Sequence, residues 1–339
     1  MKKAVIFGDR KAGIVEVPDP KPKEDWVVVK VHASAMCTEY KKFAAGKKLD
    51  KTGHEGAGEV VELAQPVSGI RVGDRVAILP QHACFQCELC LSGDWIYCEN
   101  EFDHDSFMGT PEGWGTFAEY MVKPSWLLKK IPDGVSYEYA TMVTDGIGTP
   151  YGALKAIGLD SVDTVLITGL GPVGLGGVVN ARFKGARVIG VEPQSWRRDR
   201  ATQMGADLVL DPNDEDILGK IREHTGGRGV DCAMDCSGTI QGERLCLDAV
   251  RRRGRVVFVG QSSKELPIKV SRDLISKGLT LVGNWCWRMD DLPEIMHVIQ
   301  KSDSIDLLIS HVFPMSRIQD AFELLTRGEC AKVVLKPWE

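Results

Sequence analysis

Four cysteines give the strongest chemical signal in the chain. Cys84, Cys87, Cys90 and Cys98 are separated by two, two and seven residues. Four thiolates at such spacing close a tetrahedral zinc site, which has no open position and therefore serves structure. An iron–sulfur cluster is the alternative, but the bacterial cluster motif places its last cysteine closer and follows it with proline, whereas Glu99 follows here. We therefore favour structural zinc.

A second group of metal-ligand types lies earlier in the chain. Cys37 follows the apolar run 26–34, and His54 and Glu55 stand just before the run 56–63. Cysteine and histidine are preferred zinc ligands, and a catalytic zinc takes three protein ligands and leaves one position for water or substrate. A single cysteine or histidine is more often packed in a core than bound to metal, so this hypothesis depends on the rest of the chain.

A glycine-rich turn near the middle of the chain is typical of dinucleotide binding. It follows a predicted strand, 164–168, and opens a predicted helix, 173–184. In such a motif the first glycine permits a tight turn, the second lets the backbone approach a pyrophosphate, and the third brings helix against strand. The helix N-terminus favours the negative charge of the phosphates. The residues expected to bind the cofactor here are Gly169, Gly171, Pro172, Val173 and Gly174.

An acidic residue follows at the spacing that dinucleotide recognition requires. Glu192 ends a second apolar run, 187–191, and lies 18 residues after Gly174. At that position a carboxylate accepts the ribose hydroxyls and repels a 2′-phosphate, which favours NAD over NADP. Arg197 follows closely and is a further candidate for contact with the cofactor. The two strands, the helix and the acid predict one βαβ unit that binds NAD.

Length and composition bound the class of protein. With 339 residues, of which 43% are hydrophobic, about two domains are expected. The net charge of −5 arises from interspersed charges, which argues against nucleic acid and anionic membranes as partners. No apolar run approaches the roughly 20 residues of a membrane span, and the first apolar run is too short for a signal peptide. A cytoplasmic location is expected, where cysteines serve as ligands or buried thiols rather than disulfides.

The elements that must position these residues fall into three regions. Residues 1–146 alternate short strands with Gly- and Pro-rich turns, which predicts a mostly antiparallel β domain, with a short helix at 35–45. Residues 147–285 predict a doubly wound parallel sheet, with strands at 164–168, 187–191, 207–210, 230–235, 255–260 and 279–284. Residues 286–339 predict a return to the first domain, with helices at 292–300 and 317–326 and a strand at 332–335. The active site is expected in the cleft between the two lobes.

Taken together, these motifs resemble the zinc-dependent medium-chain dehydrogenase family, which includes alcohol, polyol and threonine dehydrogenases. The resemblance covers essentially the whole chain. It rests on Cys37, the triplet Gly53-His54-Glu55, the four-cysteine lobe, the run from Gly115 to Tyr120, the glycine turn and the closing run from Lys332 to Leu335. It implies a GroES-like β domain with a catalytic zinc, a Rossmann domain, and hydride transfer between nicotinamide and a carbinol carbon.

The resemblance also implies roles for individual residues. Cys37 and His54 match the first two ligands of the catalytic zinc, and Asp145 stands where the third ligand lies, a cysteine in classical alcohol dehydrogenases. Glu55 matches a carboxylate beside the metal that binds it directly in some polyol enzymes. A carboxylate in place of a thiolate makes a harder metal site and leaves the charge of the ligand set unchanged. One catalytic and one structural zinc per chain are expected.

The proton relay is where this sequence departs from the family pattern. Relatives usually carry Ser or Thr two residues after the zinc cysteine, followed by Asp, whereas Thr38 and Glu39 come one residue earlier. One residue turns a helix by about 100°, so we predict that Glu39 accepts the alcohol proton and that Thr38 points away. The alternative is that Glu39 pairs with a surface lysine such as Lys42 and that water relays the proton.

The function predicted from these residues is an NAD- and zinc-dependent dehydrogenase of a secondary alcohol. A polyol or sugar derivative is favoured, because the flat rings of Trp114, Trp285 and Trp287 suit sugar faces if they line the cleft. Threonine or another hydroxy amino acid is an alternative, with Arg288 as the candidate cation for its carboxylate. A simple alcohol, or a non-catalytic protein that binds NAD and zinc, are further alternatives.

A homodimer or homotetramer is also expected. The last predicted strand of the parallel sheet, near Thr280 to Asn284, would leave an unpaired edge. Such an edge invites pairing with a second copy across a two-fold axis.

Overall fold

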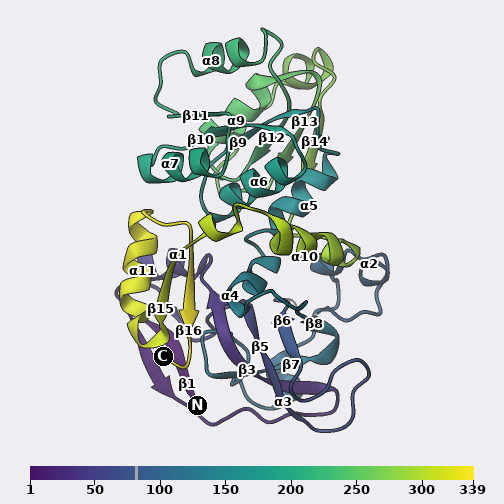
Figure 1. Ribbon diagram of the computed structural model, residues 1–339, viewed down its shortest axis with the longest axis vertical. Coiled ribbons are helices and arrows are strands. Elements are labelled where there is room, and N and C mark those ends of the chain that lie inside the picture. Colours follow the sequence, from purple (N-terminus) through teal and green to yellow (C-terminus); the bar gives the residue numbers. More distant parts are fainter. Residues whose placement is uncertain (81–82) are drawn as a thin grey trace. The chain divides into compact units, whose positions relative to one another are not determined.

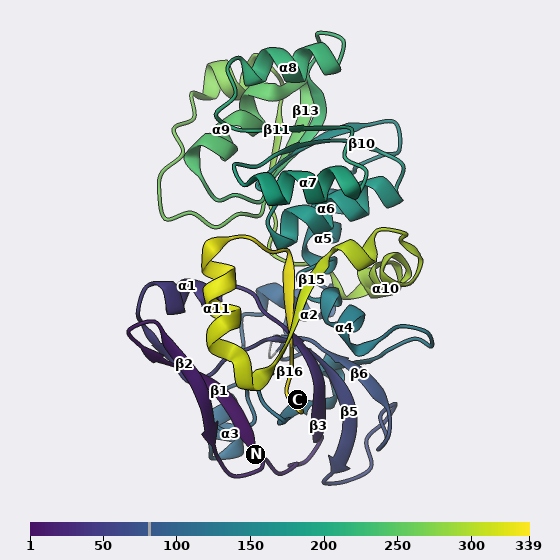
Figure 2. The same ribbon diagram turned by 60° about the vertical axis from the view of Figure 1, so that its left-hand side comes forward.

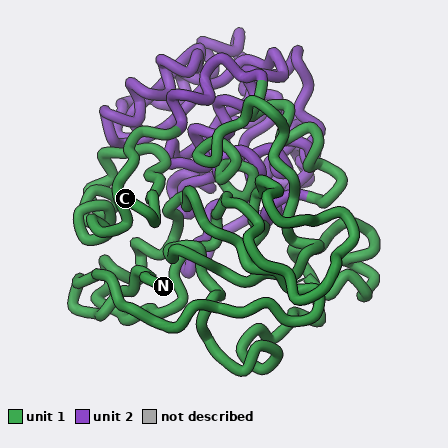
Figure 3. Tube along the Cα trace, turned by 60° about the horizontal axis from the view of Figure 1, so that its bottom comes forward, with its two compact units in different colours: residues 1–145, 288–300, 309–339 green, residues 146–287, 301–308 purple. Residues whose placement is uncertain are grey.

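The computed structural model describes residues 1–80 and 83–339. The chain divides into two compact units, which Figure 3 shows in separate colours. Unit 1 comprises Met1–Asp145, Arg288–Gln300 and Ile309–Glu339, and unit 2 comprises Gly146–Trp287 and Lys301–Leu308. Unit 1 is therefore assembled from three separate pieces of chain, whereas unit 2 is nearly continuous.

Unit 1 is built mainly from antiparallel strands. Its strands are β1 (Lys2–Gly8), β2 (Lys11–Glu16), β3 (Trp26–Ala35), β4 (Lys48–Leu49), β5 (Glu55–Leu63), β6 (Arg75–Ile78), β7 (Tyr120–Pro124), β8 (Leu128–Lys130), β15 (Ile309–Pro314) and β16 (Lys332–Lys336). The larger sheet has the order β15-β16-β3-β5-β6-β8, with β7 also paired to β3, and the smaller sheet has the order β2-β1-β4. The mostly antiparallel β domain was predicted, but β4 and β15 were not.

The central strand β3 shows why this region forms a sheet. Its valines are β-branched, which suits a strand, and three of them, Val27, Val29 and Val31, occupy every second position. Val27, Val29 and Val31 point into one buried cluster with Val76 of β6 and Val60 of β5. Successive side chains of a strand point to opposite faces, so this alternation fixes the register of β3 between β5 and β7.

The helices of unit 1 are short, apart from two near the C-terminus. They are α1 (Glu39–Ala44), α2 (Glu88–Leu91), α3 (His104–Met108), α4 (Tyr137–Ala140), α10 (Leu292–Lys301) and α11 (Ile318–Arg327). Apolar residues of α11 join a core cluster with residues from the start of the chain. Phe322 of α11 stacks on Phe43 of α1, with ring centroids 5.0 Å apart. The predicted return of the C-terminal region to the first domain thus has a packed aromatic contact.

Unit 2 contains a parallel sheet. Its strands are β9 (Thr164–Thr168), β10 (Arg187–Val191), β11 (Leu208–Leu210), β12 (Val230–Asp235), β13 (Val250–Phe258) and β14 (Thr280–Gly283), in the order β11-β10-β9-β12-β13-β14. Its helices are α5 (Gly148–Ala156), α6 (Pro172–Phe183), α7 (Ser195–Gln203), α8 (Ile217–His224) and α9 (Ile240–Ala249). Every strand pair in this sheet is parallel, as the sequence predicted.

Helices cover both faces of this sheet, as Figures 1 and 2 show. Two neighbouring residues of β9 show that a helix covers each face. Leu166 lies in a buried cluster with Leu247 of α9, whereas the side chain of Ile167 meets the glycines of α6. Because both faces are covered, the strand is apolar throughout.

The strand order reverses between β9 and β12. The chain runs from β9 outwards to β10 and β11 on one side, and then continues with β12, β13 and β14 on the other. In open parallel sheets, ligands bind outside the carboxyl ends of the strands at such a reversal. This edge of unit 2 is therefore the expected cofactor crevice.

Candidate active site

Four potential metal ligands converge in unit 1. Cys37, His54, Glu55 and Asp145 each present one ligand atom, and these atoms all lie within 4.8 Å of one another. The sheet explains the first three, because Ala35 at the end of β3 pairs with Glu55 at the start of β5. Cys37 and His54 therefore emerge at the same end of two neighbouring strands.

The contacts within this cluster centre on Asp145. Its Oδ2 lies 3.2 Å from Cys37 Sγ and 3.3 Å from His54 Nε2. A thiol, an imidazole nitrogen and a carboxylate oxygen thus point at one small volume. These are the ligand types that zinc prefers.

Glu55 adds a further indication that the cluster suits a cation. Its side chain is fully buried, and Oε1 is paired with Nζ of Lys332. Its other oxygen, Oε2, has no hydrogen-bond partner within residues 1–80 and 83–339. A buried carboxylate oxygen without a partner is costly, and a cation beside the ligand atoms would remove that cost. The residues present therefore fit a zinc ion.

The protonation of the cluster is consistent with this interpretation. Burial raises the pKa of the Cys37 thiol to about 12, and the charge of Asp145 adds to that shift. Burial opposes protonation of His54, but the charge of Glu39 and the bond with Asp145 place its pKa well above the ordinary value. Cys37 and His54 therefore hold protons until a divalent cation replaces them, which makes metal affinity depend on pH.

Glu39 has a defined place beside the cluster. Its buried carboxylate accepts hydrogen bonds from His54 Nδ1 at 2.8 Å and from the backbone N–H groups of Cys37 and Gly53, both at 3.2 Å. Burial opposes ionisation, but the charge of His54 and these bonds lower the pKa of Glu39. A carboxylate on the far nitrogen of a metal-binding histidine fixes which nitrogen faces the metal. Glu39 thus contacts His54 rather than the lysine Lys42.

The helix that carries Glu39 is shorter than predicted. It begins at Glu39 instead of residue 35, because β3 continues to Ala35 and the N–H of Met36 donates to the carbonyl of Val333. Thr38 is exposed at the N-terminal cap. Acceptance of the alcohol proton by Glu39 stays a prediction, to which the bond with His54 adds a positioning role.

Lys332 is the residue of this site whose role sequence reasoning missed. It opens β16 and is 1% exposed, with Nζ paired to Glu55 and 3.4 Å from the carbonyl oxygen of Met36. The sequence did contain a signal. A lysine that begins a strand and precedes three buried apolar residues, Val333 to Leu335, needs an acidic partner in the core.

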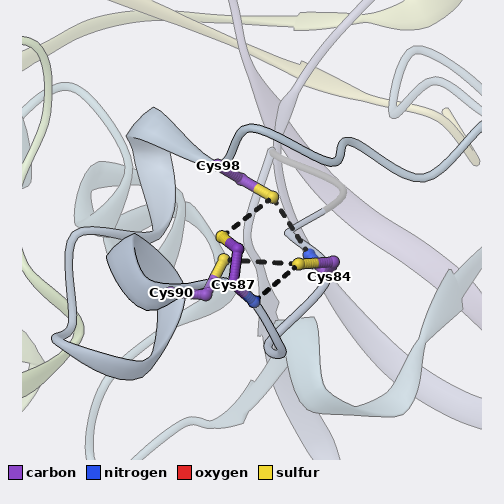
Figure 4. A group of neighbouring side chains, drawn as sticks. All are labelled: Cys84, Cys87, Cys90 and Cys98. Carbon is purple, nitrogen blue, oxygen red and sulfur yellow. Dashed lines mark hydrogen bonds between the residues drawn. The ribbon is translucent and has the colours of Figure 1, made fainter.

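The four cysteines form a separate cluster in unit 1, shown in Figure 4. Cys87 caps α2 and Cys90 lies within it. The sulfur atoms of Cys84 and Cys90 lie 4.0 Å apart, and those of Cys87 and Cys98 lie 3.9 Å apart. Four sulfurs placed tetrahedrally at a Zn–S distance of about 2.3 Å would lie about 3.8 Å from one another. The spacing therefore fits one zinc ion bound by all four.

Backbone N–H groups favour a thiolate at one of these cysteines. Cys84 Sγ accepts from the N–H groups of Gln86 and Cys87, at 3.4 and 3.3 Å. These bonds lower the pKa of Cys84 to about 6. A cysteine that is ionised at neutral pH is ready to bind a metal ion.

Arg288, the candidate for binding a substrate carboxylate, is instead engaged with this lobe. Its Nη1 donates to Asp94 at 2.6 Å, Nε lies 3.2 Å from Asp290, and Nη2 donates to the carbonyl of Ser92. The backbone N–H of Met289 donates to Gly93 at 3.0 Å. Arg288 thus ties the cysteine lobe to the C-terminal part of unit 1.

The tryptophans expected in a cleft differ in their surroundings. Trp287 is buried, with 2% exposure, whereas Trp285 is 53% exposed. Trp114 lies partly exposed beside Lys51, whose Nζ is 5.9 Å from the ring centroid. Because Trp287 is enclosed, it does not offer a free ring face to a sugar.

The glycine turn of unit 2 has the geometry that dinucleotide binding requires. Gly169 has a φ of +80°, and a Cβ atom on Gly174 would lie 1.9 Å from the carbonyl oxygen of Gly169. Larger residues are therefore excluded at both positions. Gly171 caps α6, and Pro172 and Val173 form its first turn. The free N–H groups of that turn are available to phosphate.

Glu192 and Arg197 lie beside this turn. The carboxylate of Glu192 accepts from the N–H of Leu170 at 2.8 Å and from that of Gln194 at 3.1 Å. Nη1 of Arg197 is 4.0 Å from Glu192 and would lie 3.7 Å from a Cβ atom on Gly171. The structure thus brings the predicted cofactor residues together.

Two family models match most of the chain. Residues 23–133 match the alcohol dehydrogenase GroES-like domain, and residues 172–301 match the zinc-binding dehydrogenase model. An L-threonine 3-dehydrogenase of Pyrococcus horikoshii is 34% identical, over 95% of this chain and 94% of that protein. The chain belongs to the zinc-dependent medium-chain dehydrogenase family. The predicted GroES-like and Rossmann folds are thereby confirmed.

Further relatives of this dehydrogenase support the same class. A sorbitol dehydrogenase of Halalkalibacterium halodurans is 29% identical, over 96% of this chain and 95% of that protein. The solved structure of an alcohol dehydrogenase of Escherichia coli complexed with NADH is 25% identical, has a TM-score of 0.86 and matches over 99% of both chains. This dehydrogenase is therefore an oxidoreductase of the zinc-dependent alcohol dehydrogenase type.

Within the described part of this dehydrogenase, the helices are too short or too polar to cross a membrane.

Proposed function

We propose that this dehydrogenase transfers a hydride between NAD and the carbinol carbon of a secondary alcohol, favouring a polyol or sugar derivative. The observation that carries the proposal is the convergence of Cys37, His54 and Asp145 in one small volume. A dinucleotide turn with an acidic residue beside it supports it independently. The chain thus offers residues for both reactants of an alcohol dehydrogenase.

The proposal includes one catalytic and one structural zinc per chain. Cys37, His54 and Asp145 would hold the catalytic zinc, and the four cysteines would hold the structural zinc. A catalytic zinc lowers the pKa of an alcohol hydroxyl and polarises its oxygen. Glu39 would hold His54 in its binding orientation and accept the alcohol proton.

NAD is the proposed cofactor because of Glu192. A carboxylate has about four lone-pair positions, of which Glu192 uses two on backbone N–H groups. The remaining positions are available to ribose hydroxyls. A 2′-phosphate would bring further negative charge beside the carboxylate. The relative complexed with NADH supports the same cofactor.

Threonine is the second candidate substrate. It is favoured by the relative at 34% identity, which is named an L-threonine 3-dehydrogenase. The sorbitol dehydrogenase at 29% identity favours the polyol. An amino-acid substrate needs a cation for its carboxylate, and Arg288 already contacts two aspartates and a carbonyl. We therefore rank the polyol first.

We also propose that copies of the chain pair through β14 into dimers, or tetramers built from them. Ile275 and Val270, which precede this strand, are 72% and 58% exposed. An edge strand beside exposed apolar side chains is suited to pairing across a two-fold axis.

The need to keep four thiolate ligands reduced supports a cytoplasmic location.

An NAD-reduction screen over polyols, sugars, hydroxy amino acids and simple alcohols tests the proposal. We expect NADH formation with at least one polyol or sugar, and its loss in the Asp145→Ala variant, which controls for contaminating enzymes. Turnover with threonine alone would favour the second candidate. Binding of NAD and zinc with no turnover of any alcohol would support a non-catalytic protein.

A further inference from the structure

A buried carboxylate lies at the cofactor edge of unit 2. Asp235 ends β12 and is 0% exposed. Its Oδ1 accepts from the hydroxyl of Thr168 at 2.7 Å, and from the hydroxyl and the N–H of Ser237 at 2.6 and 3.2 Å. Its Oδ2 accepts from the N–H of Gly238 at 3.0 Å. Such a buried anion is tolerable because donors surround it.

The residues that bond Asp235 lie at the carboxyl end of β9 and in the turn that follows β12. Thr168 ends β9 and directly precedes Gly169, the first glycine of the dinucleotide turn. Ser237 and Gly238 form the turn after β12. A Cβ atom on Gly169 would lie 2.7 Å from both the nitrogen and the Cα of Ser237. The two turns therefore touch backbone to backbone, and Asp235 bonds the residue that leads into one and the residues that form the other.

A third turn packs around the same carboxylate. Gly260, after β13, donates its N–H to the carbonyl oxygen of Asp235 at 2.9 Å. A Cβ atom there would lie 2.2 Å from the nitrogen of Gly238 and 2.6 Å from Oδ2 of Asp235. The ends of β9, β12 and β13 thus meet at one side chain, and the crevice expected at this edge lies directly beyond them.

We propose that Asp235 is a positioning residue for the dinucleotide. Its carboxylate holds the glycine turn and the turn at Ser237 and Gly238 in the shape to which the cofactor binds. Asp235 itself is enclosed and acts through these turns. This inference rests on the proposed NAD-dependent function, and it assigns a determinant of cofactor affinity outside the glycine motif.

The chain offers a matched control on the same strand. Asp231, at the start of β12, is 6% exposed and accepts from the N–H of Thr164 at 2.8 Å and from Nε of Arg251 at 2.6 Å. It thus ties β12 to β9 as Asp235 does, but at the opposite end of both strands. A comparison of variants at the two positions therefore distinguishes a general loss of sheet stability from a loss of shape at the cofactor edge.

Asparagine is an informative substitution at both positions. In Asp235→Asn, the new NH₂ group meets the N–H of Ser237 or that of Gly238, whichever way the amide is turned. In Asp231→Asn it meets the N–H of Thr164 or Nε of Arg251. Both variants therefore place a donor against a donor in a buried site, at nearly constant volume.

The test is the Kd for NADH by fluorescence titration of the metal-loaded full chain, together with metal content and the urea midpoint. We expect Asp235→Asn to raise the Kd at least about tenfold at unchanged metal content. Asp231→Asn should lower the urea midpoint comparably and change the Kd less than about threefold. Thr168→Val, which removes one of the donors, should raise the Kd by a smaller factor and serves if Asp235→Asn does not fold.

Two results would overturn this inference and leave the proposed function unaffected. One is a wild-type Kd in both Asp235→Asn and Thr168→Val. The other is an equal rise of the Kd in Asp231→Asn, which would assign Asp235 only a general structural role. A wild-type chain that loads metal but binds no NADH overturns the proposed cofactor, and this inference with it.

Discussion

The ammonium group of Lys332 in β16 is paired with the carboxylate of Glu55 in β5, and the two side chains are 1% and 0% exposed. Burial already raises the pKa of Glu55 to about 7, so without the cation of Lys332 this carboxyl must take up a proton to stay buried at pH 7, and the favourable pairing is lost. We expect Lys332→Met to lower the free energy of unfolding by about 3–5 kcal/mol. Urea unfolding at pH 7 measures it. The double variant Glu55→Gln, Lys332→Met should recover part of the loss, and a single-variant loss below about 1 kcal/mol would contradict this account.

Lys123 in β7 gives a pH-dependent prediction. Its buried Nζ donates to the carbonyl of Pro80 at 3.0 Å, and burial lowers its pKa from 10.5 to about 7. In the unfolded chain, Lys123 takes up a proton as the pH falls below 10.5. In the folded protein it does so only below a pH of about 7. Stability therefore falls as the pH drops from 10.5 to about 7, and the cost is fully present below that.

Lys123→Met should accordingly raise the free energy of unfolding at pH 6 by up to roughly 4 kcal/mol, reduced by the contribution of the hydrogen bond that is lost. Near pH 10.5 the variant should give no such gain. Urea midpoints across this pH range measure the difference. Lys184→Met, at an exposed position, is the control and should show no pH-dependent gain. A pH-independent effect of Lys123→Met would show that its charge is not the cause.

The two proposed metal sites should separate on mutation. Cys87→Ser should remove one metal ion and lower the thermal midpoint, because a structural zinc contributes folding free energy directly. Asp145→Ala should keep the fold and lose turnover. Metal content, thermal unfolding and NAD reduction are measured together on both variants. Full stability and activity of Cys87→Ser would be evidence against a structural zinc.

Glu39 and Thr38 should differ sharply in their effect on turnover. Glu39→Gln removes the carboxylate that accepts from His54 and that we predict accepts the alcohol proton, so kcat should fall about 10²-fold or more. Thr38→Val, at an exposed cap position, should stay within a few-fold. The comparison is made at equal metal occupancy and across pH. The opposite ranking would assign the relay to Thr38.

Glu192→Ala should narrow the preference for NAD over NADP. The variant removes both the acceptor for the ribose hydroxyls and the charge that opposes a 2′-phosphate. The measurement is the ratio of kcat/KM with NAD to kcat/KM with NADP. Arg197, beside the site, should favour the binding of NADP in the variant. A wild-type ratio of one or less would already exclude the NAD assignment.

The features that could be predicted from the sequence are those in which neighbouring residues carry the whole signal. The glycine turn and its helix follow from Gly169 to Gly174, because the turn conformation and the helix start are local. The four-cysteine lobe follows from spacing within 15 residues, from Cys84 to Cys98. In both cases the residues that carry the signal are close neighbours in the sequence.

The features that were missed depend on distant partners. Lys332 and Glu55 are 277 residues apart, and Glu39 meets His54 only because β3 and β5 pair at that end. Asp235 belongs to no recognisable motif, since its partners come from the ends of other strands. The strand β15 was missed because it lies at a sheet edge and its pattern, ISHVFP, does not alternate clearly. In each case tertiary pairing, which the local pattern does not encode, decides the outcome.

The three-piece construction of unit 1 has a consequence for synthesis on the ribosome. Residues 146–287 leave the ribosome while β16 is still to be made, so most of unit 2 can fold first. The strand β16 must then insert beside β3, where Val334 pairs with Ala35. Until Lys332 arrives, Glu55 has no buried cation to pair with. A nascent chain that stalls before Lys332 would thus carry a nearly complete dinucleotide unit and an unfinished metal centre, exposed to the quality control of the cell.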